Sequence, residues 1–126
     1  MSAAVALQRK LETDTAAYQT LQKDLSKAVE SRQKLDSQLQ ENKLVQQEFA
    51  LLKDEANIYK LIGPVLVKQD KPEAVTNVDK RIDFIQKEIE RVEKQLKDLQ
   101  EKSEKKRMEL VQTQAALQQQ AGPASS

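Results

Sequence analysis

The sequence predicts a mainly α protein, a long antiparallel coiled-coil helical hairpin with one short β-hairpin at the bend. Two long segments repeat apolar residues with a heptad period, which is typical of helices that pair along a narrow seam. Between them, residues 57–70 have the composition of β-strands and contain a turn signal. The chain is 38% hydrophobic and 33% charged, a balance that suits paired helices better than a compact core. We therefore expect a single domain over residues 1–126.

The first helix is expected at about residues 5–53, where neither proline nor glycine interrupts the chain. Its heptad starts at Leu7 and Leu11 and runs without a skip to Phe49. Polar side chains nevertheless fall on some seam positions, namely Asp14, Arg32, Asn42 and Gln46. Residues 44–52 contain more apolar side chains than one seam needs, so this end of the helix is expected to pack against something besides its partner helix.

The β-hairpin is expected at about residues 57–69, with its turn at Gly63 and Pro64. Glycine can adopt the positive φ that a type II′ turn requires at its first central position, and the fixed φ of proline suits the second. This turn sets the register of the two strands. The expected cross-strand pairs are Ile62 with Val65, Leu61 with Leu66, and Lys60 with Val67.

Both faces of this hairpin are largely apolar, and its edges would be free to pair with other strands. A two-stranded hairpin on its own is only marginally stable in water. The sequence therefore predicts an obligate oligomer that assembles through hairpins. The residues expected to build this assembly surface are Ile58, Tyr59, Leu61, Ile62, Val65, Leu66 and Val67.

The second helix is expected at about residues 72–119. Asp70 as the cap, Pro72 in the first turn and Glu73 together form a helix-start signature. A Gly-Pro pair and serines follow the last heptad, so residues 121–126 are expected to form a disordered tail.

The seam between the two helices is expected to be uneven. Every seam position of the second helix is aliphatic over residues 75–99, whereas Asp14 occupies a seam position far from the hairpin. A carboxylate buried without a partner is costly. Asp14 is therefore expected to reach Lys106 or Arg107, or to stay in water at an open seam, and this part of the seam is expected to be looser.

Aliphatic side chains reappear at the helix ends farthest from the β-hairpin. They are Val5, Leu7, Leu11, Leu110, Val111 and Leu117. Two interpretations stay open for these residues. They close the seam on one another, or the helix pair splays there and its apolar side chains contact another protein.

Composition argues against several classes of function. The chain has no histidine and no cysteine, which removes the commonest general base, metal ligand and thiol nucleophile. We therefore expect no enzyme, no catalytic residues, no metal site and no cofactor. The net charge of +1, with acids and bases interspersed, does not favour nucleic acid or a membrane surface as a partner. No apolar run approaches the ~18 residues that a membrane span requires, so we expect a soluble cytoplasmic protein.

The hairpin and its flanks resemble the β-class subunits of the prefoldin family. The resemblance is most specific in residues 60–69, extends over 57–70 and 73–75, and recurs in 21–27 and 32–35 of the first helix. It covers nearly the whole chain except the termini. A single hairpin per chain matches the β class, whereas α-class subunits have two.

This resemblance implies a hexamer of two α-class and four β-class subunits, whose hairpins form a double β-barrel body that carries six coiled coils. It also implies that the distal coil ends hold unfolded proteins, notably actin and tubulin, without ATP. The held proteins would pass to the cytosolic group II chaperonin. The alternative is a structural spacer or tether, in which the helices act as rigid rods and bind no unfolded chains.

Overall fold

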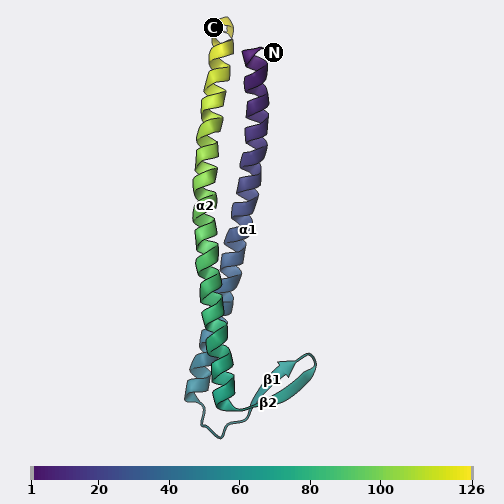
Figure 1. The fold of residues 1–126 in the computed structure, drawn as a ribbon, viewed down its shortest axis with the longest axis vertical. Coiled ribbons are helices and arrows are strands. Elements are labelled where there is room, and N and C mark those ends of the chain that lie inside the picture. Colours follow the sequence, from purple (N-terminus) through teal and green to yellow (C-terminus); the bar gives the residue numbers. More distant parts are fainter. Residues whose placement is uncertain (1, 126) are drawn as a thin grey trace. The chain divides into compact units, whose positions relative to one another are not determined.

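The computed structural model describes residues 2–125, and the side chains of residues 2–120. The elements follow one another as α1 (Ala3–Leu51), β1 (Ile58–Ile62), β2 (Val65–Gln69) and α2 (Lys71–Ser125) (Figure 1). This order confirms the predicted fold class, in which two long helices flank one β-hairpin. The chain divides into two compact units, one of Met1–Glu30 with Glu93–Ser126 and the other of Ser31–Val92.

Helix α1 begins and ends close to the predicted limits, and polar contacts hold both ends. At its start, the backbone N–H of Val5 donates to Oγ of Ser2 at 3.2 Å, which satisfies one of the N–H groups that the first turn leaves free. Just after its end, Nζ of Lys71 donates to the carbonyl oxygen of Leu52 at 2.7 Å. The side chain of Lys71, the first residue of α2, therefore satisfies a backbone carbonyl just after the end of α1.

In the unit Ser31–Val92, the two helices pack through an aliphatic core. The buried residues are Leu39, Ile82, Ile85 and Ile89, with Leu35 and Val78 packed against them. These are seam positions of the predicted heptads. Nε2 of Gln46, another seam residue of α1, donates to Oδ1 of Asp79 at 2.9 Å. The two predicted seams therefore meet each other in this unit.

In the unit of Met1–Glu30 and Glu93–Ser126, the seam mixes apolar and polar residues. The buried apolar residues are Ala28 and Leu99, and the buried polar residues are Asp14, Ser103 and Thr113. Ser103 accepts a hydrogen bond from Nε2 of Gln22 on the facing helix. Among the described side chains no buried polar atom lacks a hydrogen-bond partner, as an interior of low dielectric requires.

The β-hairpin has the predicted register. Its antiparallel pairs include Ile62 with Val65, Leu61 with Leu66, and Lys60 with Val67. Gly63 has a φ of +58°, which only glycine adopts without a steric cost. No other described residue has a positive φ, so Pro64 follows with a negative φ, as a type II′ turn requires and a type I′ turn does not allow.

Helix α2 starts as predicted but ends later. The backbone N–H of Ala74 donates to the carbonyl oxygen of Asp70 at 2.9 Å, so Asp70 occupies the cap position. The structure extends α2 to Ser125, beyond the predicted end near residue 119. A disordered tail over residues 121–126 stays a prediction. Residue 126 lies outside the described residues.

Within the described residues, neither helix has a stretch apolar enough to cross a membrane.

Candidate functional site

The β-hairpin presents almost all of its predicted assembly surface to solvent. Exposed fractions run from 43% for Val67 to 66% for Leu61, and the exposed members are Tyr59, Leu61, Ile62, Val65, Leu66 and Val67. Ile58 is the exception, with 8% exposed, because it lies at the base of β1 against the helices. The strands form a two-stranded sheet, so both outer edges carry backbone groups that can pair with another strand.

This exposure is energetically unfavourable for a hairpin in water. Burying apolar surface is worth roughly 25 cal/mol per Å², and a two-stranded sheet has no second layer to supply that burial. Apolar side chains are exposed on both faces of the hairpin, so a partner that packs against one face would leave the other face in water. The hairpin therefore fits a position inside a larger β structure built from several chains.

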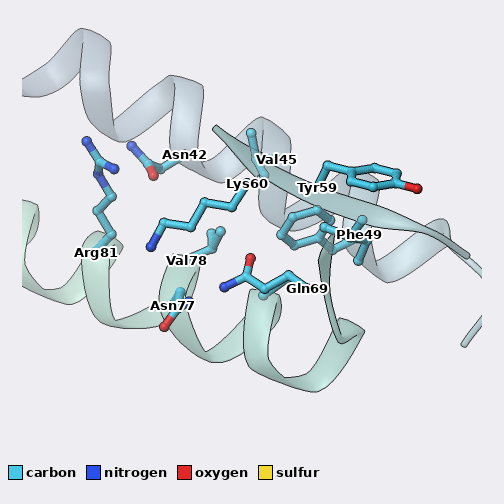
Figure 2. A pocket seen from close by; sticks show the side chains of 11 residues that line it. Asn42, Val45, Phe49, Tyr59, Lys60, Gln69, Asn77, Val78 and Arg81 are labelled. Carbon is cyan, nitrogen blue, oxygen red and sulfur yellow. The ribbon is translucent and has the colours of Figure 1, made fainter. Parts of the chain in front are cut away.

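A cleft of about 480 Å³ lies between the hairpin and the ends of the two helices. Figure 2 shows Lys60 extending from β1, Arg81 rising from α2, and Asn42 on α1. The apolar part of the lining comes from Val45, Phe49, Ile58, Ala74 and Val78. Sequence reasoning predicted extra packing near residues 44–52 but not this cleft, because it depends on how the hairpin folds back over the helices.

The predicted binding residues at the helix ends divide into two groups. Val5 and Val111 are exposed, at 43% and 53%. The partly buried members are Leu7, Leu11, Leu110 and Leu117, as expected of side chains that help to close a seam. Met108 is 52% exposed and was missed by the sequence analysis. Its spacing of three residues from Val111, which puts both on one helix face, was the available signal.

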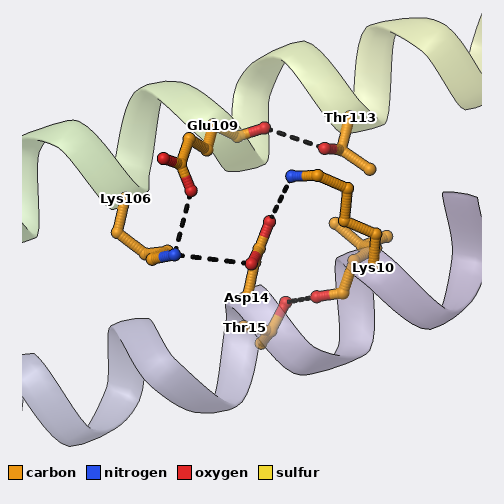
Figure 3. A network of polar contacts seen from close by, with 7 residues as sticks. Lys10, Asp14, Thr15, Lys106, Glu109 and Thr113 are labelled. Carbon is orange, nitrogen blue, oxygen red and sulfur yellow. Dashed lines mark hydrogen bonds and ion pairs between the residues drawn. The ribbon is translucent and has the colours of Figure 1, made fainter.

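A network of charges surrounds Asp14 (Figure 3). Asp14 is only 7% exposed. Its Oδ2 accepts from Nζ of Lys10 at 2.8 Å, and its Oδ1 accepts from Nζ of Lys106 on the facing helix at 3.5 Å. Lys106 also donates to Glu109 at 2.9 Å. The prediction that Asp14 reaches Lys106 is therefore confirmed, whereas Arg107 pairs with Glu104 instead.

The network shifts the pKa values of Asp14, Lys106 and Glu109 in the direction that keeps each group charged. The hydrogen bond from Lys10 lowers the pKa of Asp14, against the opposing effect of burial, and the charges of Lys10 and Lys106 lower it further. The hydrogen bond to Glu109 raises the pKa of Lys106, and the same bond lowers the pKa of Glu109. These shifts keep Asp14, Lys106 and Glu109 charged near neutral pH.

A charged layer in a seam affects pairing more than it adds stability. Polar seam residues fix the register of a coiled coil at a cost in stability, because burial removes water from the charges. Both Asp14 with Lys106 and Gln22 with Ser103 join the two helices across the seam. Specific polar contacts therefore join the two helices in the unit that also carries Val5, Met108 and Val111.

A family model described as a prefoldin subunit matches residues 12–120. Prefoldin subunit 6 of Bos taurus is 50% identical over 112 residues, which cover 89% of this chain and 87% of that protein. Prefoldin subunit 6 of Saccharomyces cerevisiae is 51% identical over 96 residues, or 76% of this chain and 84% of that one. Prefoldin subunit 6 of Arabidopsis thaliana is 47% identical over 121 residues, or 95% and 94%.

Solved structures show the same fold. The crystal structure of the prefoldin beta subunit from Thermococcus strain KS-1 aligns with a TM-score of 0.74 at 29% identity, over 86% of this chain and 92% of that one. The beta2 subunit from the same strain aligns with a TM-score of 0.64 at 26% identity, over 72% and 97%. The two long helices and the single hairpin are thus shared with prefoldin beta subunits.

The chain therefore belongs to the prefoldin family and is a chaperone subunit that acts in protein folding. Within that family it is similar to prefoldin subunit 6 of an animal, a yeast and a plant. The resemblance at residues 21–27, 32–35 and 60–69 had indicated a β-class subunit of this family, and this prediction is confirmed.

Proposed function

We propose that this chain is a subunit of a hetero-hexameric, ATP-independent holdase that assembles through its β-hairpin and binds unfolded proteins at its helix ends. One observation carries the proposal: a member of the prefoldin family presents a two-stranded hairpin with apolar side chains exposed on both faces. The surface is suited to binding and carries no arrangement that suggests catalysis.

Assembly is assigned to the hairpin residues Ile58, Tyr59, Leu61, Ile62, Val65, Leu66 and Val67. Strand partners would pair with the free backbone edges, and apolar side chains of other subunits would cover both faces. Gly63 and Pro64 keep the two strands in register through the turn. The other α- and β-class prefoldin subunits are the proposed partners.

Client binding is assigned to the helix ends, where Val5 and Val111 are exposed together with Met108. These side chains offer a small apolar surface, so one chain would bind an unfolded protein weakly. Several helix pairs in one complex would raise the effective concentration of binding sites and supply the affinity. Leu7, Leu11, Leu110 and Leu117 would contribute wherever the seam opens to expose them.

Finer parts of the proposal come from the family resemblance. We infer that residues 1–126 act as one domain, that the protein works in the cytoplasm, and that actin and tubulin are among its clients. We also infer delivery of these clients to the group II chaperonin. Neither a cofactor nor a metal enters this mechanism.

The test is suppression of light scattering by denatured actin diluted into buffer with the reconstituted complex. The variant Met108→Ser/Val111→Ser should protect actin less well, because it removes exposed apolar side chains without touching the seam. Val29→Ser is the matched control, since Val29 is 40% exposed in the same unit but lies away from the helix ends. Equal protection by the double variant and wild type would remove these residues from the binding surface.

The second candidate is a structural spacer or tether. It is favoured by the partial burial of Leu7, Leu11, Leu110 and Leu117, which fits leucines that only close the seam. An assembled complex of such rods would leave the aggregation of denatured actin unchanged, so the scattering experiment separates the two candidates.

A further inference from the structure

The cleft between the hairpin and the helices, here called the hairpin cleft, combines an apolar floor with a charged rim. Its floor includes Phe49 and Val78 from the helices and the buried Ile58 from β1. Tyr59 also lines the cleft and is 56% exposed, so the cleft continues into the exposed hairpin surface. All of these residues belong to the unit Ser31–Val92.

The charge of the hairpin cleft is entirely positive. Lys60 and Arg81 line it, and among the described residues no aspartate or glutamate does. Neither cation forms an ion pair with any acid in the part of the chain that the structure describes. Glu41 lines a smaller adjoining hollow with Arg81 without pairing with it, and Asp79 accepts from Gln46.

Amides complete the polar part of the lining, at Asn42, Gln69 and Asn77. In Figure 2 the guanidinium of Arg81 lies near the amide of Asn42, and the Lys60 side chain extends towards α2 above Asn77. Guanidinium, ammonium and amide N–H groups are the donors that bind a carboxylate, and arginine can bind it through two parallel hydrogen bonds. The lining therefore matches a carboxylate carried between apolar side chains.

We propose that the hairpin cleft receives a carboxylate-bearing, otherwise apolar segment of a different prefoldin subunit, and that its charge disfavours a second copy of this chain. The proposal rests on the proposed function, because it assumes assembly through the hairpin. It adds a rule for partner choice: the apolar surface drives association, and the two unpaired cations select which neighbour is accepted.

The chain's own hairpin explains why a second copy is a poor occupant. Residues 58–69 carry Lys60 and Lys68 and no acid. A second copy would therefore bring further positive charge to a cleft that already holds Lys60 and Arg81. Like charges placed together in an interface reject a partner that apolar contacts alone would accept.

Co-assembly tests the attractive half of the proposal. The chain is mixed with the other prefoldin subunits of its organism, and intact-complex mass spectrometry measures its incorporation. Lys60→Glu/Arg81→Glu should lower the apparent affinity by about tenfold or more, whereas the control Lys94→Glu/Lys97→Glu makes the same charge change on exposed α2 residues away from the cleft and should incorporate like wild type. Incorporation of both variants within about twofold of wild type would overturn the proposal.

The neutral variant Lys60→Gln/Arg81→Gln separates charge from folding. It should fall between wild type and the reversed variant, and its assembly should depend less on salt than that of wild type. A role for charge would be contradicted if the neutral variant incorporates as poorly as Lys60→Glu/Arg81→Glu and its assembly depends on salt as that of wild type does. Failure of the wild-type chain to enter a six-chain complex would reject the proposed function itself. Equal assembly of wild type and variants would instead reject only the role of the hairpin cleft.

Self-association tests the repulsive half. In sedimentation experiments on the chain alone, Lys60→Gln/Lys68→Gln should associate more strongly than wild type, because the like charges are removed while the apolar surface stays. A photo-crosslinking residue at Asn77 then identifies the occupant in the full complex. We expect the crosslinked peptide to come from another subunit and to contain aspartate or glutamate. The assignment would be overturned if self-association is unchanged and the crosslinks either join only copies of this chain or do not form.

Discussion

Asp14 lies in a helix–helix seam, and its contacts explain how the seam holds a charge there. Lys10 supports the carboxylate from the same helix, and Lys106 reaches it from the facing helix. Glu109 balances the second lysine at 2.9 Å. Removing any one of these groups would leave an uncompensated charge near the seam, which is why the network is expected to act as a unit.

Acid is expected to destabilise the unit that contains Asp14. The pKa of Asp14 is lowered in the folded chain, chiefly by the hydrogen bond from Lys10. Its contribution to stability is therefore complete above the unfolded pKa of ~3.9 and is lost as pH falls through the lower folded value. Between ~pH 4 and ~pH 2 the melting temperature of wild type should fall more steeply than that of Asp14→Asn, as followed by circular dichroism.

Other carboxylates also contribute to the pH dependence of the melting temperature. The pKa values of Glu104 and Glu109 are also lowered by their cationic partners, so Asp14→Asn should reduce the acid sensitivity without abolishing it. Glu12→Gln, at an exposed position of the same helix, serves as the control. Parallel pH profiles for wild type and Asp14→Asn would show that the ionised Asp14 carboxylate contributes nothing to stability.

At the scale of elements, the face of α2 that meets α1 carries the packing energy. Ile85 is 3% exposed in the aliphatic core, and its neighbour Phe84 is 64% exposed. Ile85→Ala should cost roughly 2–5 kcal/mol of unfolding free energy because it opens a cavity. Phe84→Ala, one residue away on the solvent face, should change it by no more than about 0.5 kcal/mol. Urea unfolding measures both, and a similar cost for the two would mean that α2 is rotated from its observed face.

The hairpin depends on one backbone conformation. Gly63 has a φ of +58°, and a Cβ added there would meet no atom within 4 Å. Any effect of Gly63→Ala therefore comes from backbone strain alone, roughly 1–2 kcal/mol. If assembly needs the formed hairpin, this substitution should raise the midpoint concentration for complex formation by about 5–30-fold.

Asparagine provides the matched control at this turn, since it is found more readily than alanine at the positive-φ positions of such turns. Gly63→Asn should therefore assemble at a concentration between those of wild type and Gly63→Ala. Assembly of the alanine variant at the wild-type concentration would show that the turn does not need its observed conformation.

At the scale of the whole molecule, the two units differ in what fills their seams. The unit Ser31–Val92 has an aliphatic core and carries the hairpin, whereas the other unit buries Asp14, Ser103 and Thr113 and carries the exposed residues at the helix ends. This division fits a chain that assembles through one unit and contacts clients through the other. The aliphatic core therefore lies in the same unit as the hairpin through which the proposed assembly takes place.

Local patterns were enough to predict much of this architecture. The heptads predicted the seam in which Leu39 and Ile85 are buried, and the Gly63 turn predicted the strand register, because both depend on neighbours close in sequence. Asp14 was correctly joined to Lys106 because the register followed from the heptads. The hairpin cleft could not be predicted, since it depends on the direction in which the hairpin leaves the helices.

Two other differences have local causes. Met108 could not be predicted from the heptads because it lies outside the seam, although its spacing of three residues from Val111 places both on one helix face. The structure extends α2 to Ser125, beyond the end near residue 119 that Gly122 and Pro123 predict.

The measurement that tests the central claim most directly is purification of the tagged chain from its native cells followed by intact-complex mass spectrometry. We predict a complex of six chains in which five other small coiled-coil subunits accompany this one. Purification of the chain alone, or as a simple homodimer, would contradict both the assignment of the hairpin to hetero-oligomeric assembly and the holdase function built on it.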